Sequence, residues 1–193
     1  MITDTVSSHA CLTKYLPQPP SIPYHTQHLT IMPDHPAAIP NAALKPLAPL
    51  IGEWSTTGTH PLVPNVTLHG ISTFKWLEGG AFLIWHSSID YESFPAGIAI
   101  FGSDDLGGRC DGTEYYMLWF DERGTSRKYN VSIEGEGEGG GLMVKWWRDA
   151  PEFSQRNVWI LNEDGDRIEG KGEMSRKGGE WEGDLSLDFR RVK

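Results

Sequence analysis

Two polar residues in predicted strands could act on a small molecule: His86 in "LIWHSSID" and Arg148 in "LMVKWWRD". An imidazole exchanges protons near neutral pH, so His86 could serve as an acid or base if it reaches an interior cavity; the alternative is a hydrogen-bonded wall histidine. An inward guanidinium needs a partner, because burying an unpaired charge is unfavourable. For Arg148 that partner is either a wall carboxylate or a carboxylate or carbonyl of a ligand. Tyr129, Gln155 and Asn157 are placed to add polar contacts.

Other reactive patterns do not reach the required geometry. The two serines that follow His86 directly have no identifiable activating base. The glycine-rich run at 134–141 lacks the lysine and the helix that complete a phosphate loop. His60 and His69 flank a turn, but no strand spacing brings them and His86 together as three metal ligands. We therefore expect no metal site and no cofactor.

Tryptophan is abundant, and all eight tryptophans come after residue 50. Large flat aromatic rings favour a cavity for flat or extended hydrophobic molecules. Four of them could line such a cavity: Trp76, Trp119, Trp146 and Trp159. The alternative is that they fill the interior, since a barrel of about eight to ten strands either packs its centre or encloses one small ligand.

The elements that must position these residues are strands. From Leu50 onward, strand-like runs alternate with turn residues, and no helical apolar stripe is present. Ten strands are predicted, at 50–59, 66–77, 81–90, 96–102, 114–122, 126–134, 142–149, 153–162, 167–174 and 181–192. Short glycine- and aspartate-rich links join neighbouring strands antiparallel, and closure removes the exposed edges. The predicted fold is an all-β, up-and-down antiparallel barrel of about ten strands.

Alternation of apolar and polar residues assigns the faces of several strands. The residues predicted to point inward are Phe74, Trp76, Tyr129, Val131, Ile133, Leu142, Val144, Trp146, Arg148, Trp181, Leu185, Leu187, Phe189 and Arg191. Those predicted to point outward are His69, Lys75, Lys145, Trp147, Asp149, Glu182, Asp184, Ser186, Asp188 and Arg190. Strands 81–90 and 114–122 are apolar on both faces, so their pattern does not orient them.

Composition changes near residue 50. The first fifty residues hold nine of the thirteen prolines, while all 22 glycines come later. Proline fixes φ and removes a backbone donor, so residues 1–40 are expected to form an extended, poorly ordered tail. Asn41 can cap a short helix over 41–47, before Pro49. The predicted barrel domain covers 41–193.

Charge and segment composition exclude several partners. The formal net charge of −9 argues against a nucleic-acid partner, which requires clustered Lys and Arg. No run approaches the roughly 18 to 20 apolar residues of a membrane span, and residues 1–31 show no secretory signal pattern. Cys11 and Cys110 form no disulfide framework. We expect a cytoplasmic protein without a membrane or nucleic-acid partner; the sequence leaves its oligomeric state open.

Several stretches carry a family resemblance. Gly52-x-Trp54 on the first strand, the antiparallel meander and Arg191 near the chain end resemble the calycin superfamily of lipocalins, fatty-acid-binding proteins and nitrobindins. Within it, "LAPLIGEW", "WLEGGAFL", "GIAIFGSDD", "DERGTSRKY" and "APEFSQR" are similar to an uncharacterised lipocalin-like family of small bacterial and fungal proteins. The resemblance covers residues 45–192.

This resemblance implies that Trp54 plugs one barrel end, with Arg191 crossing over its ring, so Gly52, Trp54 and Arg191 are expected to be structural. Nitrobindins bind haem through a histidine in the C-terminal part of the barrel. This sequence has no histidine after His86, so haem binding is not carried over.

The function expected is binding of a small hydrophobic or aromatic molecule inside the barrel. Candidate ligand-binding residues are Phe74, His86, Trp119, Tyr129, Trp146, Arg148, Gln155 and Trp159. The alternative is a cofactor-free cyclase or isomerase acting on a hydrophobic biosynthetic intermediate, with His86 and Arg148 as catalytic residues, since such catalysis needs mainly shape and a polarising donor. A weaker third possibility is an interaction module that uses the proline-rich tail.

Overall fold

The computed structural model describes residues 41–104, 114–135 and 141–193. The fold described below lies within one compact unit of the chain. The predictions for residues 1–40 and for Cys110 lie outside the described residues. None of the helices in the described part has the length and apolar character of a membrane-crossing helix.

The described chain is all-β apart from two 3-10 segments, η1 (Ala42–Leu50) and η2 (Glu78–Gly80). Its strands are β1 (Gly52–Thr59), β2 (Leu68–Leu77), β3 (Phe82–Ile89), β4 (Gly97–Ser103), β5 (Tyr115–Asp121), β6 (Ser126–Glu134), β7 (Met143–Arg148), β8 (Phe153–Leu161), β9 (Arg167–Arg176), β10 (Glu182–Gly183) and β11 (Ser186–Arg191). Each of the ten predicted ranges overlaps a strand of this set.

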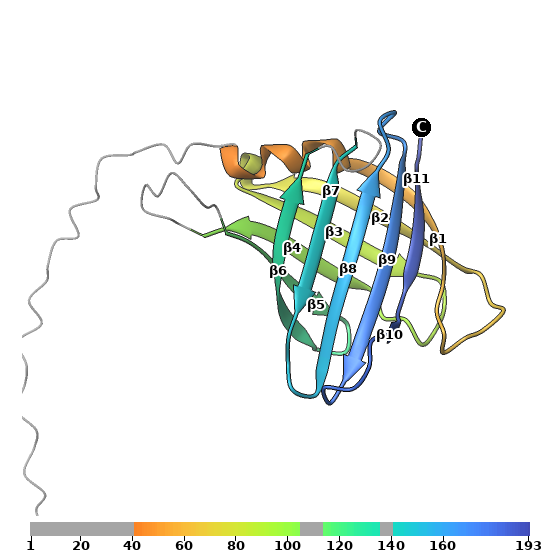
Figure 1. Cartoon of the computed structure of the whole chain (residues 1–193). Helices are drawn as coiled ribbons and strands as arrows, with labels where there is room; N and C mark the ends of the chain where they lie inside the picture. The colour runs from red at the N-terminus through yellow and green to blue at the C-terminus, as the bar shows by residue number, and fades with distance from the viewer. Residues whose placement is uncertain (1–40, 105–113, 136–140) are drawn as a thin grey trace, which may run out of the picture. The chain divides into compact units, whose positions relative to one another are not determined.

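The strands form one closed antiparallel barrel. Each strand from β1 to β9 pairs with the next along the chain, and β11 pairs with both β9 and β1. The two-residue β10 extends the sheet only as a partner of β9. The barrel therefore has ten strands in an up-and-down order, and no main strand is left with a free edge. The predicted fold class is confirmed (Figure 1).

The last predicted strand, 181–192, is interrupted in the structure. The chain leaves the ladder between β10 and β11, at Asp184 and Leu185, and the break changes which residues point inward. Trp181 was predicted to face inward, but it is exposed and lies under the guanidinium of Arg156, 4.2 Å from its ring centre. Asp184 was predicted to face outward, but it turns into the barrel mouth. Strict alternation failed because it assumes an unbroken pleat.

The helix η1 covers one end of the barrel (Figure 1). Asn41 caps it by accepting a 3.0 Å hydrogen bond from the backbone N–H of Ala43, as predicted. A 3-10 helix has three residues per turn, so every third residue shares a face. Three leucines at this spacing are fully buried and close the apolar interior: Leu44, Leu47 and Leu50.

The closure between the first and last strands rests on Trp54 and Arg191, which are paired across β1 and β11. The guanidinium carbon of Arg191 lies 4.2 Å from the centre of the Trp54 ring. Its nitrogens donate to the backbone carbonyls of Pro49, Ile51 and Gly165 at 2.5–2.7 Å. The indole N–H of Trp54 donates to the carbonyl of Leu50 at 2.8 Å. Both residues therefore join the strand ends to η1.

Two structural constraints favour glycine at position 52 of the Gly-x-Trp motif. Its φ of +134° lies in a region that side chains rarely adopt. A β-carbon at this position would also lie 2.8 Å from Nη1 of Arg191. Glycine at 52 therefore leaves room for the guanidinium over the Trp54 ring.

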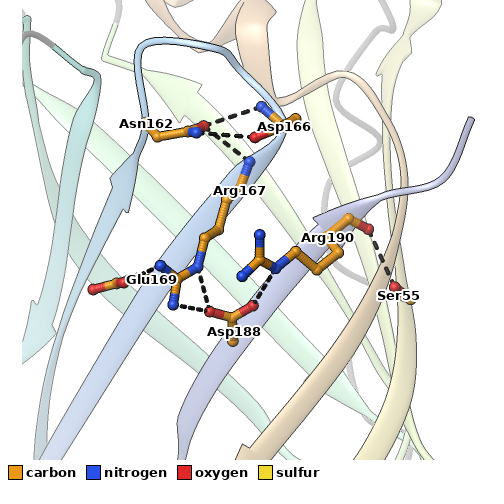
Figure 2. A network of polar contacts seen from close by, with 7 residues as sticks. All are labelled: Ser55, Asn162, Asp166, Arg167, Glu169, Asp188 and Arg190. Carbon is orange, nitrogen blue, oxygen red and sulfur yellow. Dashed lines mark hydrogen bonds and ion pairs between the residues drawn. The ribbon is translucent and has the colours of Figure 1, made fainter.

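On the outer wall, an ion-pair network joins β9 to β11 beside this closure (Figure 2). Arg167 donates from Nε to Oδ2 of Asp188 at 2.6 Å and pairs with Glu169 at 2.7 Å. Arg190 donates from Nε to Oδ1 of the same Asp188 at 3.0 Å. The hydroxyl of Ser55 donates to the carbonyl of Arg190 at 3.3 Å, which adds β1 to the network. Exposed ion pairs contribute little individually, so the network mainly aligns the closing strands.

Candidate functional site

A cavity of about 290 Å³ lies inside the barrel. It is lined by inward side chains of several strands and by residues of the β1–β2, β3–β4 and β5–β6 turns. In an up-and-down barrel these turns lie at the end away from η1, which precedes β1 (Figure 1). The cavity is thus closed at the η1 end by packed side chains and reaches its mouth at the opposite end.

Four tryptophans line the cavity: Trp85, Trp119, Trp146 and Trp159. Trp159 lies at their centre, with a T-shaped contact to Trp85 at 4.7 Å and a second to Trp146 at 6.1 Å between ring centres. Trp119 lies 5.4 Å from Trp85. Edge-to-face packing holds aromatic rings in defined orientations, so the wall presents fixed flat surfaces.

Two indole N–H groups in this wall have no acceptor. Nε1 of Trp85 and Nε1 of Trp146 are buried without a hydrogen-bond partner among the described residues. Buried indole N–H groups usually find a partner, and an unmet donor costs about 1 to 3 kcal/mol. The wall therefore retains hydrogen-bonding capacity beside its apolar surface.

A chain of hydrogen bonds runs from the cavity wall to the β1–β2 turn. The hydroxyl of Tyr129 donates to Oε1 of Gln155 at 2.6 Å. Nε2 of Gln155 donates to Oδ2 of Asp184 at 2.7 Å. Nε2 of His60 lies 2.9 Å from Oδ1 of Asp184, and Nδ1 of His60 accepts from the backbone N–H of Leu62 at 3.0 Å. The chain fixes five residues from four different segments at the mouth.

The partners in this chain determine where its protons lie. Nδ1 of His60 accepts a backbone hydrogen bond, so the proton of the neutral ring is on Nε2, which donates to Asp184. The side-chain amide of Gln155 directs its NH₂ group toward the carboxylate of Asp184, because its carbonyl oxygen in that position would be repelled by the negatively charged carboxylate oxygens. The hydroxyl proton of Tyr129 is then donated to the carbonyl oxygen of Gln155. The lone pairs of the Tyr129 oxygen remain able to accept a hydrogen bond.

The environment of Tyr129 shifts its proton equilibrium. Burial raises the pKa of Tyr129 above its ordinary value, and the charge and hydrogen bonding of Arg127, together with the charge of Arg148, partly oppose this rise. The hydroxyl is therefore protonated at neutral pH and acts as a hydrogen-bonding group. Both arginines lie close enough to Tyr129 to act on it electrostatically.

Asp121 lies at the mouth and is held as a carboxylate. Its Oδ2 accepts from Nη2 of Arg123 at 2.7 Å, and its Oδ1 accepts from the Arg123 backbone N–H at 3.1 Å. Nε1 of Trp119 donates to Oδ2 at 3.4 Å. Hydrogen bonding by Arg123 lowers the pKa of Asp121 from 3.8 to about 2, against the opposing effect of burial. Asp121 thereby orients the Trp119 indole in the cavity wall.

Five of the eight predicted ligand-binding residues line this cavity: Trp119, Tyr129, Trp146, Gln155 and Trp159. Asn157, singled out with Tyr129 and Gln155, also lines it. Phe74 lies behind the wall, fully buried and stacked on Trp85 at 5.8 Å between ring centres. Phe74 thus supports the wall without lining it.

The prediction that His86 reaches the cavity is wrong. His86 is exposed on the outer face of β3, because its neighbours Trp85 and Ser87 are the residues that point inward. It lies in an outer apolar groove with Ile98 and Phe120. Strand β3 is apolar on both faces, so its sequence pattern does not show which face points inward. The prediction placed His86 on the wrong face. His86 and an inward Arg148 lie on opposite sides of the wall and cannot act together on one enclosed molecule.

Arg148 lies on the inward side of β7, as predicted, near the end of the strand. It is half-buried, it pairs with Gln155 across β7 and β8, and its charge acts on Tyr129. Among the described residues it forms no ion pair, so the wall carboxylate considered from the sequence is not found there.

Sequence reasoning missed several residues of the site, notably Trp85, Asp121, Arg127, His60 and Asp184. The sequence pattern could have indicated Arg127. Tyr129 was predicted to face inward, and residues two apart on a strand share a face, so Arg127 should face inward as well. No alternation signal existed for Trp85 in its doubly apolar strand. The roles of His60 and Asp184 depend on a turn and a strand break, which alternation does not describe.

Comparisons with known proteins support the fold only. No family model matches the sequence, and no curated protein matches it significantly. Among solved structures, the chain is similar to that of Rv2717c from M. tuberculosis, with a TM-score of 0.59 and 15% sequence identity. The match covers 79% of this chain and 98% of that chain. The likeness is to a protein of the same barrel architecture, and at this identity it shows the fold alone.

Proposed function

We propose that this protein binds a small, flat, largely apolar molecule inside its barrel. The observation that carries the proposal is the interior cavity with four tryptophans in its wall. A barrel interior that served stability alone would be filled by side chains, because interiors pack to the density of organic crystals. Here the aromatic rings pack against one another and leave an unfilled cavity beside them.

The cavity volume limits the size of the ligand. Ligand pockets in proteins commonly measure about 300 to 1,000 Å³, and 290 Å³ is at the lower end of that range. A molecule of about two or three rings suits this volume. The T-shaped contacts of Trp159 favour a flat body, which can stack on one ring while meeting the edge of another.

Polar groups in the wall would orient such a molecule. The unpartnered indole N–H groups of Trp85 and Trp146 are potential donors, and the Tyr129 oxygen is a potential acceptor. A few fixed polar groups within an apolar pocket are the usual source of ligand specificity.

A second concavity is less suited to this role. It measures about 1210 Å³ and lies on the outer faces of β1, β7, β8, β9 and β11. It is wide and open, and its charged residues include Arg156 and Glu173, which are paired with each other at 2.6 Å. An apolar ligand on such an open, solvated surface would lose less contact with water than a ligand inside the aromatic cavity.

The proposal is tested with N-phenyl-1-naphthylamine, a neutral aromatic probe whose fluorescence rises in apolar surroundings. Ser87 lines the cavity and Ser88 lies on the outer face of the same strand, so Ser87→Leu and Ser88→Leu form a matched pair. We expect saturable binding to the wild type, loss of binding in Ser87→Leu and retention in Ser88→Leu. Equal binding by all three proteins, or by none, would contradict the proposal. Thermal unfolding of each variant checks that it is folded.

A further inference from the structure

We infer that the barrel mouth recognises an anionic group, so that the ligand is a flat aromatic acid whose carboxylate or sulfonate lies at the mouth. This inference rests on the proposed function and adds a chemical class to it. The observation behind it is that some arginines of the described residues pair with a carboxylate, whereas others have no carboxylate partner there.

Eight arginines lie in the described residues. Four of them pair with carboxylates, namely Arg123, Arg156, Arg167 and Arg190. Arg191 donates to three backbone carbonyls at the opposite barrel end. The remaining three have neither a carboxylate nor a backbone carbonyl partner within the described ranges, and they are Arg127, Arg148 and Arg176.

Two of these three arginines line the cavity, and the third lies on a strand beside it. Arg127 and Arg176 both line the cavity. Phe153 lies between them, since the Arg127 guanidinium is 5.2 Å from its ring centre and Arg176 is its cross-strand partner on β9. Arg148 lies beside Gln155 on the next strand, β7.

The two carboxylates that line the cavity are already engaged. Asp121 is held by the fork of Arg123, and Asp184 accepts from Gln155 and His60. Among the arginines and carboxylates that line the cavity, there are three arginines, Arg123, Arg127 and Arg176, and two aspartates, Asp121 and Asp184. This excess of positive charge among the cavity-lining residues, on a chain with a net charge of −9, favours an anionic group at that position.

The geometry suits one acidic group on an aromatic body. A guanidinium presents a planar fork that matches the oxygens of a carboxylate or sulfonate. Phe153 carries the aromatic surface up to the position of Arg127, so a molecule can be apolar along its length and anionic at its end. None of these three guanidiniums is neutralised by a carboxylate within the described ranges, so a bound anion would supply the missing countercharge.

The test compares two probes that differ by one charged group: N-phenyl-1-naphthylamine and its sulfonate, 8-anilinonaphthalene-1-sulfonate. Arg127→Gln and Arg176→Gln each remove one mouth charge, and Arg190→Gln removes a charge from the outer wall as the control. We expect each mouth variant to weaken binding of the sulfonate by about tenfold and to leave the neutral probe unchanged. The control should bind both probes like the wild type. Raised salt should weaken only the sulfonate.

The outcomes separate this inference from the proposed function. If the neutral probe binds in the cavity but the mouth variants bind the sulfonate as the wild type does, the anion site is wrong and the cavity proposal stands. If neither probe binds, the proposed function itself fails. Arg176 is exposed, so its variant should fold even if Arg127→Gln does not.

Discussion

The hydroxyl of Tyr129 on β6 donates a 2.6 Å hydrogen bond to Oε1 of Gln155 on β8, across the intervening strand β7. This bond is the inner end of a chain that continues through Asp184 and His60 to the β1–β2 turn. It links the side of the barrel that carries Trp146 to the turn that borders the mouth. The polar chain therefore makes the shape of the mouth depend on residues inside the cavity.

Removing Gln155 should destabilise the protein. In Gln155→Leu, Asp184 loses a donor and the buried Tyr129 hydroxyl loses its acceptor, which costs about 1 to 3 kcal/mol of unfolding free energy. Urea unfolding of Gln155→Leu, Tyr129→Phe and the double variant measures their coupling. We expect the double variant to be less destabilised than the sum of the two single variants. Strict additivity would mean that the bond does not form in solution.

Arg191 should not be replaceable by lysine. Lysine keeps the charge, but its single nitrogen cannot replace the three separate nitrogens with which Arg191 reaches three carbonyls while its guanidinium lies over Trp54. We expect Arg191→Lys to lower the free energy of unfolding by about 2 to 4 kcal/mol, since hydrogen bonds to charged groups each contribute about 1.5 to 3 kcal/mol. Lys193→Arg, near the chain end, is the control. A loss below about 0.5 kcal/mol, typical of surface changes, would contradict this role.

Asp121 should make stability depend on pH in the acid range. Its pKa is about 2 in the folded protein against an ordinary 3.8, so its contribution is fully present above about pH 4 and is lost as the pH falls toward 2. We expect a contribution of about 1 kcal/mol, because Arg123 is half exposed and partly screened by solvent. Unfolding of the wild type and Asp121→Asn across this range should give curves that converge at low pH. A difference independent of pH would show that Asp121 is not specifically held as a carboxylate.

His86 should be dispensable for ligand binding. Its side chain is exposed on the outer wall, so His86→Ala should change the free energy of unfolding by less than about 0.5 kcal/mol and leave binding of N-phenyl-1-naphthylamine unchanged. Trp85→Ala, the neighbouring inward position, should weaken binding strongly. The reverse result would place the site on the outer face.

The sequence was sufficient for the fold and for part of the site. Alternation placed Tyr129 and Trp146 inward because their strands have one polar face, and turn residues set the antiparallel order. The same logic could not separate Trp85 from His86, because β3 is apolar on both sides. It also misplaced Asp184, whose position depends on a break in the last strand. Polar partners that are distant along the chain, such as His60 and Asp184, become visible only once closure brings them together.

The central claim is that a flat molecule binds among the tryptophans inside the barrel. Nuclear magnetic resonance of the indole N–H groups tests it directly, because every tryptophan reports separately once assigned by single Trp→Phe variants. On addition of N-phenyl-1-naphthylamine, the signals of Trp85, Trp119, Trp146 and Trp159 should shift, whereas those of Trp54, at the closed end, and of the outer-wall residues Trp147 and Trp181 should not. Shifts confined to Trp147 and Trp181, or no shifts at saturating probe, would contradict the account.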